Sequence, residues 1–299
     1  MITLIDRLKK GEILISDGAM GTSLQAMGLG LGQAPEEWNI LNPEDVRKVH
    51  ESFIGAGSNM IITNTFGANP VKLKTAGLSE KFKEINAAAV KIAKEAAKNT
   101  AYVLGDMGPT GEFLKPVGNC SEGDFYSVFV EQAEILAKSG VGAFIIETMS
   151  GLDELKIAVS ACKKVGLPVI ASMTFNVTQK GYRTMAGVSV EQAAESLLDL
   201  GCEVIGANCG CGSKQMTEIM QQFKKAAGNS AFLIAQPNAG MPKLVKDKTI
   251  FDETPADFAR SVKGLVGLGV NIIGGCCGTT PEHIREIVKI VKIQNSKSK

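Results

Sequence analysis

Residues 271–284, NIIGGCCGTTPEHI, contain a short apolar run, a glycine-rich loop and the start of a helix. The apolar residues are consecutive, as in strands that are buried on both faces of a parallel sheet. The sequence Thr280-Pro281-Glu282 is typical of a helix start, because threonine can cap the helix and proline suits its first position. This stretch therefore predicts one strand–loop–helix unit.

The same pattern recurs along the whole chain. The predicted strands are EILIS (12–16), NMIIT (59–63), YVLG (102–105), AFIIE (143–147), PVIASMT (168–174), EVIGA (203–207), FLIA (232–235) and NIIGG (271–275). Helices are expected between them, with starts at Asn42-Pro43 and Thr254-Pro255 and a regular apolar period over 79–98. Eight such units are typical of an α/β fold of the (β/α)8 TIM barrel type, which we predict as a single domain over residues 1–299.

A doubly wound open sheet is the main alternative fold. It would normally have fewer strands, and its first strand would lead into a G-x-G-x-x-G loop. Here the first strand leads into DGAMGTS instead. The barrel is therefore the favoured prediction.

The composition is that of an ordinary soluble protein. The 299 residues carry 32 Lys+Arg against 31 Asp+Glu, and no long basic block appears apart from the short tail at 292–299, so nucleic acid is not an expected partner. No apolar run reaches the roughly 18 residues that span a bilayer, and the first residues lack a signal-peptide core. We expect a cytoplasmic protein without a membrane partner.

Cysteine and histidine usage narrows the chemistry. The seven cysteines are an odd number, which argues against a disulfide framework. Cys162 and Cys202 lie in apolar or helical patterns and are expected to fill the core. The only histidines, His50 and His283, both fall in helical patterns, so histidine catalysis and a multi-histidine metal site are nearly excluded.

In a barrel, the chemistry belongs to the carboxyl ends of the strands. Every predicted strand ends in polar or thiol groups there: DGAMG (17–21), TNTF (63–66), GDMGPTG (105–111), ET (147–148), TFN (174–176), NCGC (208–211), QPN (236–238) and GCCG (275–278). Any one of these could be a turn. Together they predict an active site at this end of the barrel.

Cys209, Cys276 and Cys277 are the most informative of these residues. The sixth and eighth strands have the same parity, so their inward side chains belong to the same layers. The glycines around the Cys276-Cys277 pair would allow the strand to break, so that both thiols turn inward. Three thiolates would bind zinc and leave one position open, as in catalytic zinc sites. Buried or reactive thiols, or a vicinal disulfide, are the alternatives.

A zinc ion with three thiolate ligands is a weak Lewis acid and a poor activator of water. It would instead favour the deprotonation of a substrate thiol and leave that sulfur electron-rich. Such a site suits attack by the thiol on a soft electrophile such as a methyl group.

Carboxylates at the same mouth fit an amino-acid ligand. Asp17 and Glu147 could pair with an ammonium group, and the backbone N–H groups of the turn at 18–21 could hold a carboxylate. An ordinary Asp-Gly turn and a helix-capping glutamate are the alternatives. The loop GDMGPTG lacks the ending of a phosphate-binding loop, and the low aromatic content of 5% disfavours an aromatic cage for a quaternary ammonium group.

These motifs resemble the zinc-dependent homocysteine S-methyltransferases, and most closely the homocysteine-binding domain of cobalamin-dependent methionine synthase. The resemblance covers essentially the whole chain and rests on DGAMGT, TNTFGAN, GDMGPTGE, ETMS, GANCG, QPNAG and GGCCGTTPEHI, in that order. It implies a (β/α)8 barrel in which homocysteine is methylated to methionine.

The resemblance also implies roles for individual residues. One zinc ion per chain would be held by Cys209, Cys276 and Cys277, which are therefore the expected catalytic residues, with the homocysteine sulfur as fourth ligand. The amino acid would be bound by Asp17, Glu147 and the amides of Gly18 and Ala19. Thr148 and Asn208 are expected beside it, and Asn238 would occupy the open zinc position when no thiol is bound.

Two features depart from the family pattern. Cys211 is not part of it, and could be a bystander, replace a ligand, be oxidised, or be a fourth ligand that closes a structural zinc site. A methionine synthase also continues into further domains, whereas this chain stops after the eighth helix. The resemblance therefore implies that the methyl group comes from a separate methyl-corrinoid protein or from a small molecule such as S-methylmethionine. A different thiol acceptor, and a non-catalytic barrel with Cys276-Cys277 as a thiol switch, remain open.

Overall fold

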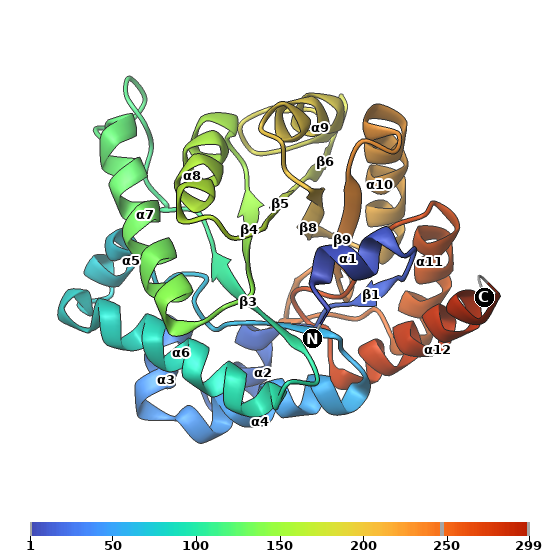
Figure 1. The fold of residues 1–299 in the computed structure, drawn as a ribbon, viewed down its shortest axis with the longest axis horizontal. Coiled ribbons are helices and arrows are strands. Elements are labelled where there is room, and N and C mark those ends of the chain that lie inside the picture. Colours follow the sequence, from blue (N-terminus) through green and yellow to red (C-terminus); the bar gives the residue numbers. More distant parts are fainter. Residues whose placement is uncertain (1, 246–247, 298–299) are drawn as a thin grey trace.

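Eight parallel strands surrounded by helices form a nearly closed barrel (Figure 1). The structure is a computed structural model that describes residues 2–245 and 248–297, so the last two residues of the basic tail lie outside it. The barrel strands are β1 (Leu14–Ile15), β2 (Met60–Ile62), β3 (Tyr102–Met107), β4 (Ala143–Met149), β5 (Val169–Met173), β8 (Val204–Gly212), β9 (Phe232–Asn238) and β12 (Ile272–Ile273). Each of the eight predicted strands overlaps one of them, and the predicted barrel is confirmed.

The strands are hydrogen-bonded in the order β1-β12-β9-β8-β5-β4-β3-β2. β1 and β2 meet through different contacts. The Asn59 N–H donates to the Ile15 carbonyl at 2.7 Å, and the Asn59 side chain accepts from the Ile15 N–H at 3.0 Å. Asp17 Oδ2 accepts from the Ile62 N–H at 2.9 Å. A carboxylate just beyond β1 thus takes the place of a backbone acceptor where the barrel closes.

One outer helix follows each barrel strand. These helices are α4 (Pro43–Ala56), α6 (Phe82–Ala97), α7 (Glu122–Ser139), α8 (Leu152–Val165), α9 (Val190–Asp199), α10 (Ser213–Ala227), α11 (Pro255–Gly267) and α12 (Pro281–Lys297). The predicted helix at 79–98 corresponds to a 3-10 turn, η2 (Ser79–Lys81), followed by α6. The main hydrophobic core lies between these helices and the outward side chains of the strands, and it includes Cys162 and Cys202 as predicted.

The inside of the barrel is apolar at one end and polar at the other. The apolar layer contains Leu14, Met60, Leu104, Ile145, Ile170, Val204, Ile234 and Ile272, and it is capped by Leu4, Ile5 and Leu8 of α1 (Leu4–Lys9). Because side chains alternate along a strand, the next inward positions lie two residues further on. They are Ser16, Ile62, Asp106, Glu147, Ser172, Gly206, Gln236 and Gly274, and Asn208 is the inward position after Gly206. Polar groups therefore gather inside the barrel near the carboxyl ends of the strands.

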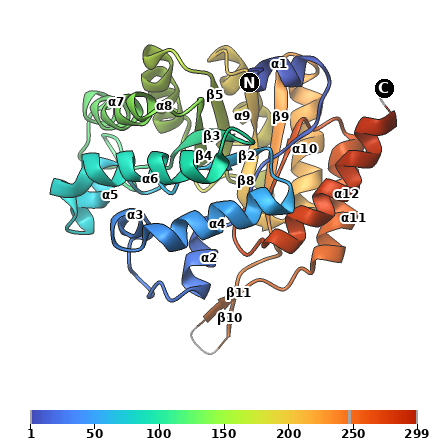
Figure 2. The same ribbon diagram turned by 60° about the horizontal axis from the view of Figure 1, so that its bottom comes forward.

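Several short elements lie in the loops at those ends. They are α2 (Met20–Ala26), η1 (Pro35–Glu37), α3 (Trp38–Leu41), α5 (Pro70–Thr75) and two hairpins, β6 (Asn176–Thr178) with β7 (Gly181–Arg183) and β10 (Lys243–Val245) with β11 (Lys248–Ile250). Figure 2 shows the β10–β11 hairpin projecting from the end of the molecule opposite α1. The hairpins were not predicted, because each strand has only three residues and no buried apolar run.

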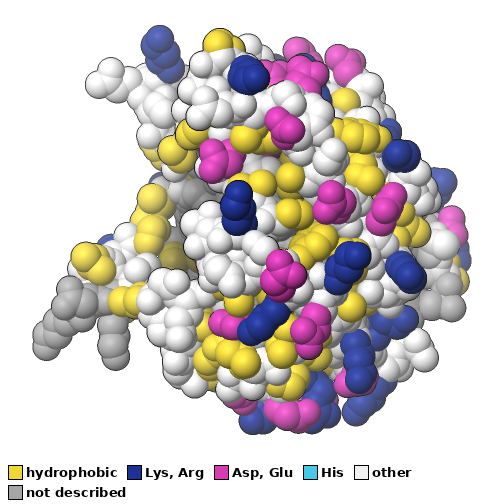
Figure 3. Space-filling model, turned by 90° about the vertical axis from the view of Figure 1, so that its left-hand side faces the viewer, with side chains coloured by type: hydrophobic (Ala, Val, Ile, Leu, Met, Phe, Trp, Pro, Cys, Tyr) yellow, Lys and Arg dark blue, Asp and Glu magenta, His cyan; other side chains and the backbone are white. Residues whose placement is uncertain are grey.

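The surface carries charges of both signs. On the face seen in Figure 3, Lys and Arg side chains are interspersed with Asp and Glu, without a continuous basic patch. Among the described residues, no helix is both long enough and apolar enough to cross a lipid bilayer.

Candidate active site and metal centre

A cavity of about 390 Å³ lies at the carboxyl ends of the strands. Among the residues that line it are most of the predicted site residues: Asp17, Gly18, Ala19, Glu147, Thr148, Cys209, Cys276 and Cys277. Asn208 and Asn238 are also buried here, but behind the lining. The fold therefore brings together residues from both halves of the chain.

The three predicted thiols form one cluster. The Sγ atoms of Cys209 and Cys277 are 4.0 Å apart, as are those of Cys276 and Cys277, and all three lie within 4.8 Å of one another. Zinc–sulfur bonds of about 2.3 Å in a tetrahedron place sulfurs about 3.8 Å apart, whereas a disulfide bond is about 2 Å long. Both the spacing and the donor atoms fit a metal ion held by three thiolates.

Hydrogen bonds to the end of β9 hold the Cys276-Cys277 pair in place. The Cys276 N–H donates to the Pro237 carbonyl at 2.8 Å, and the Cys277 carbonyl accepts from the Ala239 N–H at 2.9 Å. β12 ends at Ile273, earlier than predicted, and Gly278 has a φ of 78° that glycine adopts without strain. The chain turns at this point, which lets both neighbouring thiols face the cluster.

Cys209 lies in a distorted part of β8. This strand continues to Gly212, beyond the predicted end at residue 207, and its register against β9 shifts between Asn208 and Gly212. Cys209 has a φ of 58° and Gly210 one of 71°. A positive φ is costly for a cysteine, and such strain is typical of functional sites.

Asn208 holds Thr148 rather than lining the cavity. Its Oδ1 accepts from the Thr148 N–H at 2.8 Å and from Ser172 Oγ at 2.6 Å, and its Nδ2 donates to Thr148 Oγ1 at 2.7 Å. Thr148 has a φ of 61°, a rare conformation for a β-branched residue. The structure thus gives Asn208 the geometry of a positioning residue, which fixes Thr148 next to Glu147.

Asn238 is buried next to the thiols. Its side chain hydrogen-bonds to the Cys209 sulfur, and this contact helps to lower the pKa of Cys209. Its Oδ1 has no hydrogen-bond partner. A buried amide oxygen without a partner beside three thiols fits the proposed occupation of a fourth metal position.

The thiols shift one another's pKa values. Hydrogen bonds with Cys276 and Cys277 lower the pKa of Cys209 well below its usual value, whereas hydrogen bonds with Cys209 and Cys277, together with burial, raise the pKa of Cys276. Cys209 is therefore the thiol that most readily becomes a thiolate.

Asp17, Glu36, Asp106 and Glu147 form an acidic wall of the same cavity. Burial raises the pKa of Asp17 to about 7 and that of Glu147 to about 8, where the charges of Cys209 and Asp17 add to the effect. Glu36 and Asp106 line the same cavity, and among the described residues no Lys, Arg or His does. The wall therefore favours a bound cation.

Asp106 was not among the predicted site residues, although the sequence placed it at the end of the third strand. The alternation of side chains along the strand could have identified it, because Asp106 lies two residues after Leu104 and both face inward. Glu36 offered no such signal, since it lies in η1, far from any strand end.

Cys211 lies outside the thiol cluster. Its side chain is 1% exposed and belongs to the hydrophobic core, and burial together with the charge on Cys209 raises its pKa to about 12. The grouping of Cys209, Cys276 and Cys277 does not include it. The geometry thus gives no support to Cys211 as a fourth ligand.

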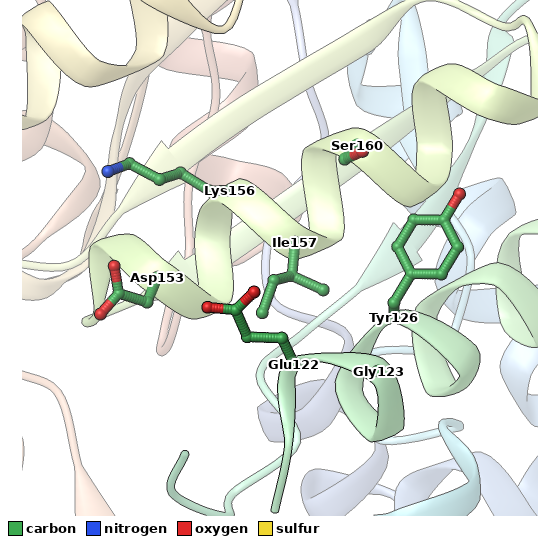
Figure 4. A pocket seen from close by; sticks show the side chains of 7 residues that line it. All are labelled: Glu122, Gly123, Tyr126, Asp153, Lys156, Ile157 and Ser160. Atoms are coloured by element: carbon green, nitrogen blue, oxygen red, sulfur yellow. The ribbon is translucent and has the colours of Figure 1, made fainter. Parts of the chain in front are cut away.

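A second hollow lies on the surface between α7 and α8 (Figure 4). Glu122, Tyr126, Asp153, Lys156 and Ser160 are among its lining residues. It contains no thiol and its charges are of mixed sign. The chemistry of the molecule is therefore concentrated in the cavity at the carboxyl ends of the strands.

The fold and the site define a class of protein: a (β/α)8 barrel whose cavity is lined by an acidic wall and by three thiols that could hold a metal ion. A family model described as homocysteine S-methyltransferase matches residues 14–291. The chain belongs to this family.

Individual relatives agree with this assignment. The chain is 30% identical to methionine synthase of Mycobacterium tuberculosis, over 96% of this chain but 25% of that protein. It is 32% identical to betaine–homocysteine S-methyltransferase 1 of Bos taurus, over 96% of this chain and 74% of that protein. The chain thus spans about a quarter of the length of the methionine synthase.

Solved structures share the fold. The oxidized form of the homocysteine methyltransferase MmuM from Escherichia coli superposes with a TM-score of 0.78 at 24% identity, covering 94% of this chain and 97% of that one. The metallated form of the same protein gives the same TM-score.

Proposed function

We propose that the protein is a zinc-dependent methyltransferase that transfers a methyl group to the sulfur of homocysteine and forms methionine. The observation that carries the proposal is that a three-thiol cluster and an acidic wall line one cavity. A thiol amino acid has complementary groups, a sulfur at one end and an ammonium group at the other. Family membership supports the same acceptor.

Cys209, Cys276 and Cys277 would hold the zinc ion. When bound, zinc would lower the pKa of a substrate thiol and keep its sulfur nucleophilic at neutral pH. Asn238 stands beside the cluster with an unpartnered oxygen, which is suited to the fourth position before the substrate arrives.

The remaining residues would bind and orient the amino acid. Its ammonium group would lie at the acidic wall with Glu147. Its carboxylate would accept from backbone N–H groups near Gly18 and the start of α2. The Ala19 N–H already donates to Thr279 Oγ1 at 3.2 Å, so the following amides, at the unpaired first turn of the helix, are better placed.

Methyl transfer would then be a direct displacement. A lone pair on the substrate sulfur forms the new S–C bond, while the bond between the methyl carbon and the donor breaks and its electron pair leaves with the donor. The thiol proton has been released before this step. The fixed positions of sulfur and ammonium group would hold the nucleophile in line with the methyl carbon.

A methyl-corrinoid protein is the proposed methyl donor. Among the described residues, all the exposed large hydrophobic side chains except Ile2 and Ile293 lie in segments between a barrel strand and its following outer helix. They are Met27, Leu31, Leu41, Phe113, Val117, Val177, Met185, Met241, Leu244, Val245 and Ile250. Exposed apolar side chains in these loops are available for contact with a protein partner at the end of the barrel that contains the cavity.

A small cationic donor such as S-methylmethionine is the second candidate. The acidic wall favours it, because a sulfonium would be attracted by Asp17, Glu36, Asp106 and Glu147. Turnover with each donor separates the two candidates. Methionine formation from the free sulfonium alone, without any corrinoid protein, would contradict the first.

The zinc centre is tested by metal content. In protein purified under reducing conditions and resupplied with zinc, we expect about one zinc ion per chain. We expect Cys209→Ala and Cys277→Ala to lose it, because two thiolates hold zinc weakly, and the matched control Cys211→Ala to retain it. Wild-type protein without stable zinc would contradict the proposal and favour a thiol switch at Cys276-Cys277. Zinc that homocysteine does not perturb would favour a structural site.

A further inference from the structure

Asp106 carries a buried carboxylate oxygen that no group in the described part of the chain satisfies. The residue is 5% exposed and lines the cavity, and its Oδ1 has no hydrogen-bond partner. Its backbone is fully engaged, since the N–H donates to Thr63 Oγ1 at 3.0 Å and the carbonyl accepts from Thr65 Oγ1 at 2.8 Å. An unpaired buried oxygen of this kind is costly unless a ligand supplies the donor.

Strand register places Asp106 beside Glu147. Asp106 on β3 pairs with Ile145 on β4, and both belong to the inward-facing set. Glu147 is the next inward residue along β4. The two carboxyl groups therefore project from neighbouring strands into the same cavity, which both of them line.

Asp17, the carboxylate that the sequence singled out, is already engaged. Its Oδ2 accepts from the Ile62 N–H at 2.9 Å and its Oδ1 from Ser16 Oγ at 3.3 Å. The first of these bonds closes the barrel between β1 and β2. Asp17 consequently has less free acceptor capacity than Asp106, although it adds negative charge to the wall.

A second acceptor that lines the cavity also has no partner. Gln236 Oε1, across the barrel on β9, has no hydrogen-bond partner either. A ligand that satisfies such a wall must bring N–H donors and a positive charge. The ammonium group of an amino acid brings both.

We propose that Asp106 is a substrate-binding residue that, together with Glu147, accepts hydrogen bonds from the α-ammonium group of the thiol amino acid. Asp17 then acts mainly by closing the barrel and by its charge. The inference rests on the proposed function, since it assumes that the substrate is an amino acid. Asp106, which was not among the predicted site residues, would then be the residue that distinguishes an amino acid from a thiol acid without an ammonium group.

The electrostatics agree with this assignment. Burial and the nearby charges of Glu147, Glu36 and Asp17 raise the pKa of Asp106 well above its usual value. Lys72 opposes this rise, but its ammonium group lies 4.7 Å from the centre of the Phe66 ring and the residue does not line the cavity. A substrate ammonium would supply the missing positive charge within the cavity.

The test compares two ligands that differ only in the ammonium group. Homocysteine and 4-mercaptobutanoate are titrated calorimetrically into the zinc-loaded wild-type protein, Asp106→Asn and the control Asp153→Asn. Asp153 is a carboxylate of the hollow between α7 and α8 and does not line the site cavity, so Asp153→Asn should keep the preference for homocysteine. In Asp106→Asn we expect Kd for homocysteine to rise about tenfold or more while Kd for 4-mercaptobutanoate changes little, because a charge-assisted bond is lost.

Thermal unfolding separates this role from a structural one. A substrate-binding role predicts that Asp106→Asn, without ligand, melts at the same or a higher temperature than the wild type, because the variant lacks a buried unpaired carboxylate. Equal losses of affinity for both ligands, an unchanged preference for homocysteine, or a lower melting temperature would overturn the inference. If Asp106→Asn does not fold, Asp106→Ser is judged by the same ratio of the two Kd values. A wild-type protein that shows no preference for homocysteine would contradict the proposed function itself.

Discussion

Two residues of the site, Thr148 and Cys209, have strained backbone conformations. Both have positive φ angles and line the cavity, and each lies next to another residue of the site, Glu147 and Asn208 respectively. Two hydrogen bonds between the Asn208 side chain and Thr148, one donated by each residue, compensate for the strain at that position. The local geometry of the acidic wall and that of the thiol cluster are therefore linked through one amide side chain.

His50 is a residue with an effect on stability rather than on the site. It is completely buried in α4, neither ring nitrogen has a hydrogen-bond partner, and burial lowers its pKa from 6.5 to about 4. The unfolded chain thus binds a proton that the folded protein excludes. The stability associated with neutral His50 is fully present above pH 6.5 and is lost as the pH falls through 4.

We predict that His50→Leu removes this dependence. Between pH 7 and pH 4 the wild type should lose about 3 kcal/mol more of its free energy of unfolding than the variant does. At pH 7 the variant should be about as stable as the wild type, because two unpartnered nitrogens are replaced by apolar atoms. Urea denaturation at several pH values measures both quantities, and parallel pH profiles would contradict the prediction.

At the scale of elements, the end of β12 decides whether the thiols meet. The strand has two residues, and the turn after it depends on Gly278, whose φ is 78°. A Cβ at this position would lie 2.2 Å from Phe251 Cγ. Strain and overlap at Gly278 would therefore be transmitted directly to Cys277.

We predict that Gly278→Ala lowers the free energy of unfolding by about 1–3 kcal/mol and weakens zinc binding. The control is Gly267→Ala in α11, where a Cβ meets nothing within 4 Å. That variant should be about 0.5–1 kcal/mol more stable than the wild type, because alanine favours the helix. Denaturation curves and zinc titrations distinguish the two, and unchanged zinc affinity in Gly278→Ala would contradict the role given to this turn.

On the scale of the whole molecule, stability and chemistry lie at opposite ends of the barrel. The apolar end is closed by α1, whereas the polar end contains the cavity and is surrounded by the connecting loops (Figures 1 and 2). This separation is the general arrangement of the fold. Loops at the open end can therefore vary without loss of the core.

We predict that Leu8→Ala, at the closed end, costs about 2–5 kcal/mol of stability, because Leu8 is 1% exposed and fills the end of the barrel. Zinc content and homocysteine affinity should stay at wild-type values under conditions where the variant is folded. Chemical denaturation and metal analysis test the two parts separately. Loss of zinc from the folded variant would show that the two ends are coupled.

The sequence by itself determined the eight strand–helix units and the cysteines expected to meet. It did so because buried strands, helix starts and glycine turns each leave a local pattern, and because parity along a strand predicts which side chains face inward. Cys209, Cys276 and Cys277 were found in this way, as were Asp17 and Glu147.

Only the tertiary structure decided which polar atoms of the site are left without a partner. It engaged Asp17 in closing the barrel, left Asp106 Oδ1 without a partner, and placed Asn208 behind Thr148. It also separated Cys211 from the thiols two residues away, through the register shift in β8. These outcomes depend on hydrogen bonds and packing between residues that are distant along the chain, and no local sequence pattern records them.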